Sequence, residues 1–113
     1  MTQLYTPQHV ANFILTKAKE GHAFVTPLKL LKLSYLTYGW VLAILDRRLF
    51  EEKIQAWKFG PVVPSLYHEF KIFGRSPIDG FSVEMNEDGS ILMPLIPKTE
   101  KDLLIVMDRC WST

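Results

Sequence analysis

The sequence predicts a protein of the mainly α (α+β) class, a compact helical domain around a buried central helix with a small β-hairpin or short antiparallel sheet. Two Thr-Pro pairs, at 6–7 and 26–27, each precede a run with apolar residues at helical spacing. The second run, residues 28–45, is apolar on almost every side, as is typical of a central helix. An Asp-Gly pair at 88–89 lies between short alternating runs and predicts a hairpin.

The first helix is predicted to begin at Thr6-Pro7, because threonine is a good N-cap and proline suits the first helical position. Val10, Phe13 and Ile14 follow at helical spacing, and Gly21 ends the run. The polar residues of this helix are expected to face water: Gln8, Asn12, Lys17 and Lys19.

The helix over residues 28–45 is expected to be central and buried on most sides. Gly39 lies inside it, where glycine costs about 1 kcal/mol relative to alanine. Together with Ala43, four residues later, Gly39 suggests that another backbone passes close by; the alternative is that the helix simply tolerates an unfavourable glycine. The uncharged part, residues 33–45, is shorter than the about 20 residues that span a membrane, so we expect a buried helix and no membrane partner.

The middle of the chain is predicted to change from extended segments to a stiff connector. Residues 49–50 and 54–59 are rich in aromatic and branched side chains, which favour extended structure. In the connector Gly60-Pro61-Val62-Val63-Pro64, two prolines exclude a regular helix and Gly60 can adopt backbone angles closed to other residues. A short helix over residues 65–73 should follow and end at Gly74.

The last third of the chain predicts the hairpin and a final helix. Phe81, Val83 and Met85 alternate with polar residues before the turn at 88–89. Thr99 to Asp102 fits a capping box with Asp in place of Glu, and an apolar helix then runs to the last residues. Since there are no repeats, low-complexity tracts or linkers, residues 1–113 are predicted to be a single domain.

Charge and cysteine usage narrow the class of partner. Thirteen basic and twelve acidic residues leave a net charge of +1, without the basic excess of most nucleic-acid binders. A helix-turn-helix DNA reader remains an alternative, but its second helix would offer only Lys29 and Lys32 to phosphates. The single Cys110 excludes an internal disulfide framework and suits a reducing cytoplasm, where we expect the protein to be located.

No residue pattern in the sequence points to catalysis. His9, His22, His68 and Cys110 share no metal-ligand spacing, and the glycines form no phosphate-binding loop. We therefore predict no metal, no cofactor and no enzymatic activity. A hydrolase-like enzyme that uses His68 or Cys110 stays open as the third class of function, because a Cys-His pair can meet in space.

The aromatic residues around the connector predict a surface that binds another protein. Tryptophan and tyrosine are favoured at protein–protein hot spots, because they bury large areas at little entropic cost. The alternative is that these rings fill the core, which we expect of Trp57 and Phe70, while Lys58 and Phe59 should be displayed. The predicted partner-binding residues are Trp57, Lys58, Phe59, Gly60, Pro61, Val62, Tyr67 and Lys71.

Several of these segments together resemble the Panacea domain family, which includes the SocA-like antitoxins and chains described as phage-associated proteins. The Trp-x-x-Gly-Pro-Val sequence at 57–62 is the most specific part, and order and spacing match across about residues 6–78. The matching segments are Leu28-Lys29-Leu30-Leu31-Lys32-Leu33-Ser34-Tyr35, Tyr38-Gly39-Trp40, Leu49-Phe50, residues 56–64, Leu66-Tyr67 and Phe70-Lys71.

The resemblance implies an antitoxin of a toxin-antitoxin system that neutralises a cognate protein toxin by direct binding. It also implies a role as a proteolytic adaptor that delivers the toxin to a ClpXP-type protease. The alternative is a phage-encoded or structural protein-interaction module that binds a host factor without catalysis. Family members continue into a C-terminal segment that this sequence is expected to lack, and such a chain could form homo-oligomers.

Overall fold

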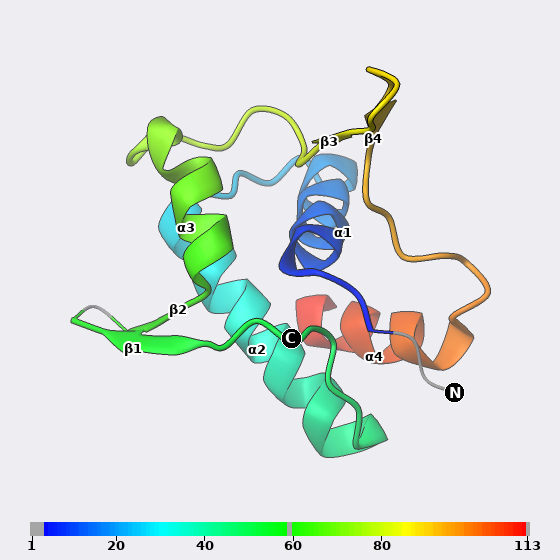
Figure 1. Ribbon diagram of the computed structural model, residues 1–113. Helices are drawn as coiled ribbons and strands as arrows, with labels where there is room; N and C mark the ends of the chain where they lie inside the picture. The colour runs from blue at the N-terminus through cyan, green and yellow to red at the C-terminus, as the bar shows by residue number, and fades with distance from the viewer. Residues whose placement is uncertain (1–3, 59, 113) are drawn as a thin grey trace.

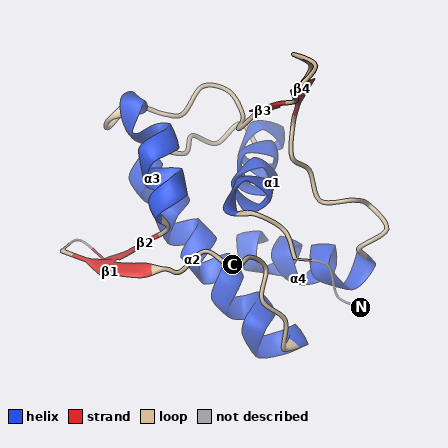
Figure 2. Cartoon of the chain, in the orientation of Figure 1, coloured by secondary structure: helices blue, strands red, loops and turns tan. Residues whose placement is uncertain are grey.

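The structure is a computed structural model that describes residues 4–58 and 60–112, and its described part has four α-helices and two small antiparallel sheets (Figures 1 and 2). This architecture confirms the predicted mainly α (α+β) class. The elements in order are α1 (Pro7–Glu20), α2 (Pro27–Leu45), β1 (Gln55–Trp57), β2 (Gly60–Val62), α3 (Pro64–Phe70), a 3₁₀ helix (Lys71–Phe73), β3 (Glu84–Met85), β4 (Ile91–Leu92) and α4 (Lys101–Ser112).

Both Thr-Pro pairs begin helices as predicted. The side-chain oxygen of Thr26 accepts a hydrogen bond from the backbone N–H of Lys29 at 3.3 Å. At the start of α1, the backbone N–H of Thr6 donates to Nδ1 of His9 at 3.2 Å. His9 therefore takes the place that Glu or Gln usually has in a capping box.

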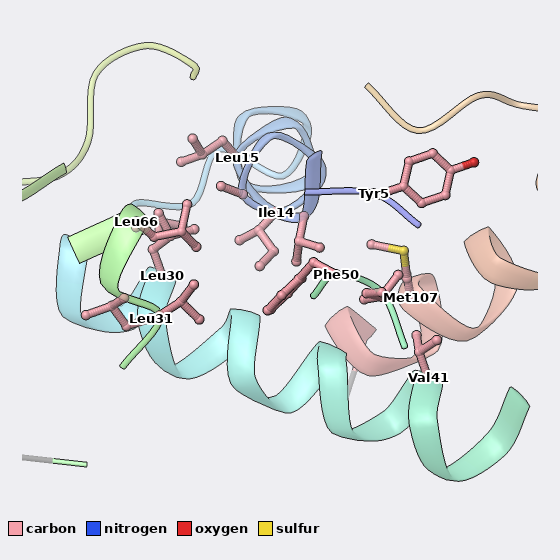
Figure 3. Close-up of a cluster of buried hydrophobic side chains, with 14 of the residues drawn as sticks. Tyr5, Ile14, Leu15, Leu30, Leu31, Val41, Phe50, Leu66 and Met107 are labelled. Atoms are coloured by element: carbon pink, nitrogen blue, oxygen red, sulfur yellow. The ribbon is translucent and has the colours of Figure 1, made fainter. Parts of the chain in front are cut away.

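One hydrophobic core is shared by all four helices. Figure 3 shows side chains from α1, α2, α3 and α4 meeting around Phe50, which lies in the loop after α2. Burial of such side chains stabilises a fold by about 1.5–3 kcal/mol each. Core residues that are almost fully buried are Val10, Ile14, Leu30, Val41, Leu49, Phe50, Val63, Leu66, Leu103 and Met107.

The prediction that α2 is buried on most sides was wrong. One face of α2 carries Leu30, Ser34, Thr37 and Val41 into the core against α1 and α4. The other face remains in contact with solvent, and its large apolar side chains are 41–52% exposed: Leu28, Tyr35, Leu36 and Leu42. By length and composition alone α2 could also cross a membrane. Its apolar character reflects two apolar faces, only one of which the described chain covers.

Asn12 does not face water, which corrects the prediction for α1. Its side chain is fully buried, and its Nδ2 donates to the carbonyl oxygens of Ser82 and Pro94, both at 2.9 Å. In return, the backbone N–H of Ser82 donates to Oδ1 of Asn12 at 2.8 Å. One side chain thus ties both ends of the segment that contains β3 and β4 to α1 (Figure 1).

The second hairpin has the predicted turn, whereas α4 begins later than predicted. β3 and β4 pair antiparallel, with Met85 opposite Ile91, and Gly89 has a φ of 87° in the turn. The capping box proposed at Thr99 would begin the final helix at residue 100. Instead α4 begins at Lys101, and Glu100 is its N-cap, since the backbone N–H of Leu104 donates to the Glu100 carbonyl oxygen at 3.0 Å.

The carboxylate of Glu100 joins three segments of the chain. Arg47 binds Glu100 with two nitrogens, at 3.2 and 2.5 Å, and the Tyr5 hydroxyl donates to Glu100 Oε2 at 2.5 Å. Arg47 follows α2, Tyr5 precedes α1 and Glu100 precedes α4. The hydrogen bond from Arg47, followed by that from Tyr5, lowers the pKa of Glu100 below its usual 4.5.

We expect this cluster to make the fold less stable in acid. Because the folded pKa of Glu100 lies below the unfolded value, its stabilising effect is present above about pH 4.5. The effect is lost as the pH falls through the folded pKa, because the carboxylate becomes protonated. Urea unfolding of the wild type and of Glu100→Gln, repeated at pH values from about 7 to about 3, measures the stabilisation by Glu100. The difference between the two proteins should shrink as the pH falls; a constant difference would contradict the assignment.

Candidate partner-binding surface

The connector predicted at 60–64 forms the second half of a β-hairpin. β1 and β2 pair antiparallel with Gln55 opposite Val62, Ala56 opposite Pro61 and Trp57 opposite Gly60. The sequence predicted an extended segment followed by a stiff connector, whereas the pairing of the two was not predicted. Figure 1 shows this hairpin extending away from the helices. Phe59, one of the predicted partner-binding residues, lies outside the described residues.

The hairpin is anchored to the body of the protein at both ends. Val62, the last residue of β2, and Val63 are buried in the core, and Pro64 begins α3. Before β1, Oε2 of Glu52 accepts a hydrogen bond from the backbone N–H of Ser65 at 2.7 Å. This carboxylate lies at the N-terminus of α3, where the helix dipole favours negative charge. The two anchors hold the hairpin and α3 in one arrangement.

Two exposed rings meet where the hairpin approaches α3. The ring centroids of Trp57 and Tyr67 lie 5.0 Å apart at an interplanar angle of 68°, an edge-on contact. The indole N–H of Trp57 donates to Oε1 of Gln55 at 2.8 Å. His68 extends the row, with its ring centroid 5.3 Å from that of Tyr67. We call Trp57, Tyr67 and His68 the aromatic platform.

The platform corrects one prediction about the rings. Phe70 is buried as expected, but Trp57 is 38% exposed instead of filling the core, and Tyr67 is 37% exposed. Trp57 remains open to solvent because it lies in β1, all three residues of which are exposed. An aromatic pair that is held by hydrogen bonding and still open to solvent suits the binding of a partner.

The other predicted partner-binding residues divide between surface and core. Lys58 and Lys71 are exposed, while Gly60 and Pro61 are half-buried in β2. Val62 is buried, so its side chain packs in the core and is not available to a partner. Gly60 has a φ of 122°, a conformation that residues with a Cβ rarely adopt, as the sequence analysis expected of it.

A matched pair of glycine substitutions tests this backbone. Gly60→Val is expected to destabilise the protein by about 1–3 kcal/mol, because valine must adopt a positive φ. Gly39→Ala should instead stabilise it by about 0.5–1 kcal/mol, because Gly39 is helical and a Cβ there would meet no atom of another element of the described chain within 4 Å. Thermal and urea unfolding measure both. An unchanged unfolding transition for Gly60→Val would show that the hairpin is not strained.

The second glycine also corrects a prediction. Gly39 was expected to mark the close approach of another backbone, but it lies on the exposed face of α2. Apart from its two chain neighbours and the nearby backbone of α2 itself, no heavy atom of the described chain lies within 4 Å of the position its Cβ would take. Ala43, one turn later, is exposed as well. At both positions, therefore, no large side chain covers the surface of α2.

Comparison with known proteins places these features in a family. The family model described as "Antitoxin SocA-like, Panacea domain" matches residues 30–103, which include most of α2, both hairpins and α3. The chain belongs to this family. The aromatic platform lies inside the matched region of the Panacea domain, as does the exposed face of α2 apart from its first turn.

A relative of this Panacea-domain chain supports the same assignment. The chain is 31% identical over 104 residues to the protein named Antitoxin SocA of Caulobacter vibrioides (strain NA1000 / CB15N). The alignment covers 92% of this chain and 55% of that protein, so the chain spans about half the length of its relative. No solved structure matches the chain.

His9, His68 and Cys110 of this Panacea domain each have different neighbours in the structure. Among the described residues, no three His, Cys, Asp or Glu side chains are placed to hold a metal ion. His9 caps α1, and burial lowers its pKa below the usual 6.5, against the opposing charge of Glu84. Cys110 lies in α4 with its sulfur 3.8 Å from the Thr37 hydroxyl. His68 belongs to the platform. Membership of an antitoxin family indicates a non-catalytic regulator.

Two surface hollows of the described chain are also separate from these groups. One lies between the end of α1 and the loop before β3, and its lining includes Lys19, Phe24, Val25 and Phe81. The other lies beside the start of α1, next to Glu51 and Glu52. Neither includes His68 or Cys110 in its lining.

Proposed function

We propose that this chain is the antitoxin of a toxin-antitoxin system and neutralises a cognate protein toxin by binding it at the aromatic platform. The observation that carries the proposal is the exposed edge-on pair of Trp57 and Tyr67, inside the region that matches the antitoxin family. Because family membership implies a toxin partner, the question is which surface meets that partner. The platform offers an exposed tryptophan and an exposed tyrosine whose rings are already in contact.

The platform is suited to this role by its low cost of ordering. A ring has two side-chain torsions, and here each ring already contacts a neighbour, so little conformational freedom remains to be lost on binding. Exposed Lys58 and Lys71 lie at the hairpin turn and just after α3, where a polar rim would surround an aromatic centre. The binding is proposed to occur in the cytoplasm, where a thiol such as Cys110 stays reduced.

Co-expression with the protein encoded by the adjacent gene tests the proposal. The chain should restore growth to cells that express that toxin, and the two proteins should co-purify. The Trp57→Ala/Tyr67→Ala variant should fold, yet rescue poorly. Failure of the wild type to rescue growth or to co-purify, while it is present as folded protein, would overturn the proposed function.

The same cells distinguish neutralisation by binding from delivery to a ClpXP-type protease. Binding alone leaves the toxin present and inactive, whereas an adaptor lowers the amount of toxin in cells that contain the protease. Immunoblots of the toxin with and without the protease separate the two modes. Co-purification of a host protein in place of the toxin would favour the alternative of a host-factor binding module.

A further inference from the structure

The exposed face of α2 has a regular composition along its length. Its members recur every three or four residues, so that they form a single row on a helix of about 3.6 residues per turn. Within the described chain this row lies opposite the buried face that carries Leu30, Thr37 and Val41. We call it the α2 stripe. It consists of the helical residues Leu28, Lys32, Tyr35, Leu36, Gly39, Leu42 and Ala43, together with Asp46, the left-handed C-cap residue that follows α2, and all are exposed.

The middle of the α2 stripe is apolar and shallow. Tyr35, Leu36 and Leu42 are each more than 40% exposed, and they surround Gly39. At Gly39 the surface is open, since an added Cβ would meet no atom of the described chain within 4 Å other than adjacent residues and the nearby backbone of α2. Two helices approach each other more closely where small residues lie at their contact. This part of the surface therefore accepts a second helix.

The two ends of the stripe carry opposite charges. Lys32 lies near the start of α2, and Asp46 follows its last residue. Within the described residues, neither forms an ion pair with another side chain of the chain. Both lie seven residues from Gly39, one on each side. A two-fold axis at Gly39 would therefore bring Lys32 of one copy to Asp46 of another.

We propose that the α2 stripe binds a second copy of this chain, with the two α2 helices antiparallel and crossing at Gly39. A residue that lies a given number of positions before Gly39 in one copy then faces the residue that lies the same number of positions after Gly39 in the other copy. Tyr35 meets the small Ala43 of the second copy, Leu36 meets Leu42, and Lys32 meets Asp46, each contact occurring twice. A tyrosine faces a small alanine, two leucines meet, and opposite charges face each other.

Charge and dipoles select the antiparallel arrangement. A parallel pair would place Lys32 beside Lys32 and Asp46 beside Asp46, which is unfavourable. Antiparallel helices also bring each positive N-terminus near a negative C-terminus. One helix face is small beside the standard interface of about 1,600 Å², so we expect a dimer with a dissociation constant in the micromolar range.

Sedimentation velocity of the chain from about 1 to about 500 µM measures this equilibrium. The wild type should change from monomer to dimer across the range. Gly39→Arg should raise the dimer dissociation constant at least about tenfold, because two arginines would meet at the axis. The monomer tolerates this change, since Gly39 is exposed and arginine is a better helix former. The matched control is Ile72→Arg, which introduces the same residue at an 85% exposed position outside α2 and should leave the dimer unchanged.

A charge series tests the register. Lys32→Glu should weaken the dimer, because glutamate would face Asp46 of the second copy. Adding Asp46→Asn to that variant should recover part of the affinity; asparagine is chosen because residue 46 has a φ of 51°, which asparagine tolerates. Recovery indicates contact between the two positions. No recovery would overturn the antiparallel register.

Two other results would also overturn the proposal. A chain that remains monomeric at every concentration does not pair through α2. Co-flotation with vesicles of phosphatidylcholine and phosphatidylglycerol, abolished by Gly39→Arg, would assign the stripe to a lipid surface. None of these measurements uses the toxin, so their outcome is independent of the proposed function.

Discussion

Replacing Asn12 with leucine is expected to destabilise the protein by about 3–5 kcal/mol, the largest effect of any single substitution considered. The amide of Asn12 makes three hydrogen bonds to the backbone of Ser82 and Pro94 within the protein interior. Leucine has a similar volume but leaves one buried N–H and two buried carbonyl oxygens without these partners. Each unsatisfied buried group costs about 1–3 kcal/mol.

Urea unfolding at neutral pH measures the effect, and two further variants show its origin. Asn12→Asp keeps the acceptor for the Ser82 N–H but loses the donor to both carbonyls, so it should also be strongly destabilised. Its loss should decrease in acid, since a protonated carboxyl can donate one hydrogen bond. As a control on the same helix, Thr16→Ala removes only a bond to a helical carbonyl and should cost less than about 1 kcal/mol. A loss below about 1 kcal/mol for Asn12→Leu would contradict the assigned role.

The starts of α1 and α2 could be predicted because their signals are local. A threonine followed by proline satisfies the backbone at a helix N-terminus wherever the chain folds. The Asp-Gly turn between β3 and β4 is equally local, because Gly89 supplies the positive φ that the turn requires. For these elements, neighbours within four residues contain nearly all the information.

The burial of α2 and of Asn12 depends on residues far away in the sequence. A helix that is apolar all round can be surrounded within its own chain or can carry a second apolar face, and the sequence of the helix is the same in both cases. Asn12 is a polar residue on an amphipathic helix, and its partners are 70 and 82 residues away. The periodicity of the helix could not show that the backbone of Ser82 and Pro94 would form hydrogen bonds with the Asn12 amide.

The candidate surface was partly predictable. The density of aromatic residues around Gly60 and Pro61 identified the region, and Trp57 and Tyr67 were both named. The pairing of β1 with β2 was missed because proline disfavours a strand. In a two-stranded hairpin, however, each strand has one unpaired edge, and Pro61 needs no N–H on that edge. The spacing of Trp57 and Gly60, with two residues between them, was the available signal for a tight hairpin.

Truncating Trp57 to alanine is expected to weaken binding of the cognate toxin by at least about 2 kcal/mol, or about 30-fold, as for a tryptophan hot spot. The fold should change little, because Trp57 is exposed on a hairpin whose anchors, Val62 and Glu52, remain. Titration calorimetry with the purified toxin measures the affinity. Ile72→Ala, which removes a more exposed apolar side chain outside the platform, should alter the affinity less than about twofold.

Trp57 and Tyr67 should act as one unit and not as two separate contacts. In a double-mutant cycle, Trp57→Ala and Tyr67→Ala should couple by about 0.5–1.5 kcal/mol, because each ring holds the other through its edge-on contact. Tyr67→Phe keeps that contact and should bind nearly as well as the wild type, unless the toxin accepts a hydrogen bond from the hydroxyl. Independent losses would show that the rings touch the toxin separately. If the toxin binds the wild type and both alanine variants equally well, the toxin occupies another surface. If the toxin does not bind the wild type, the antitoxin role itself fails.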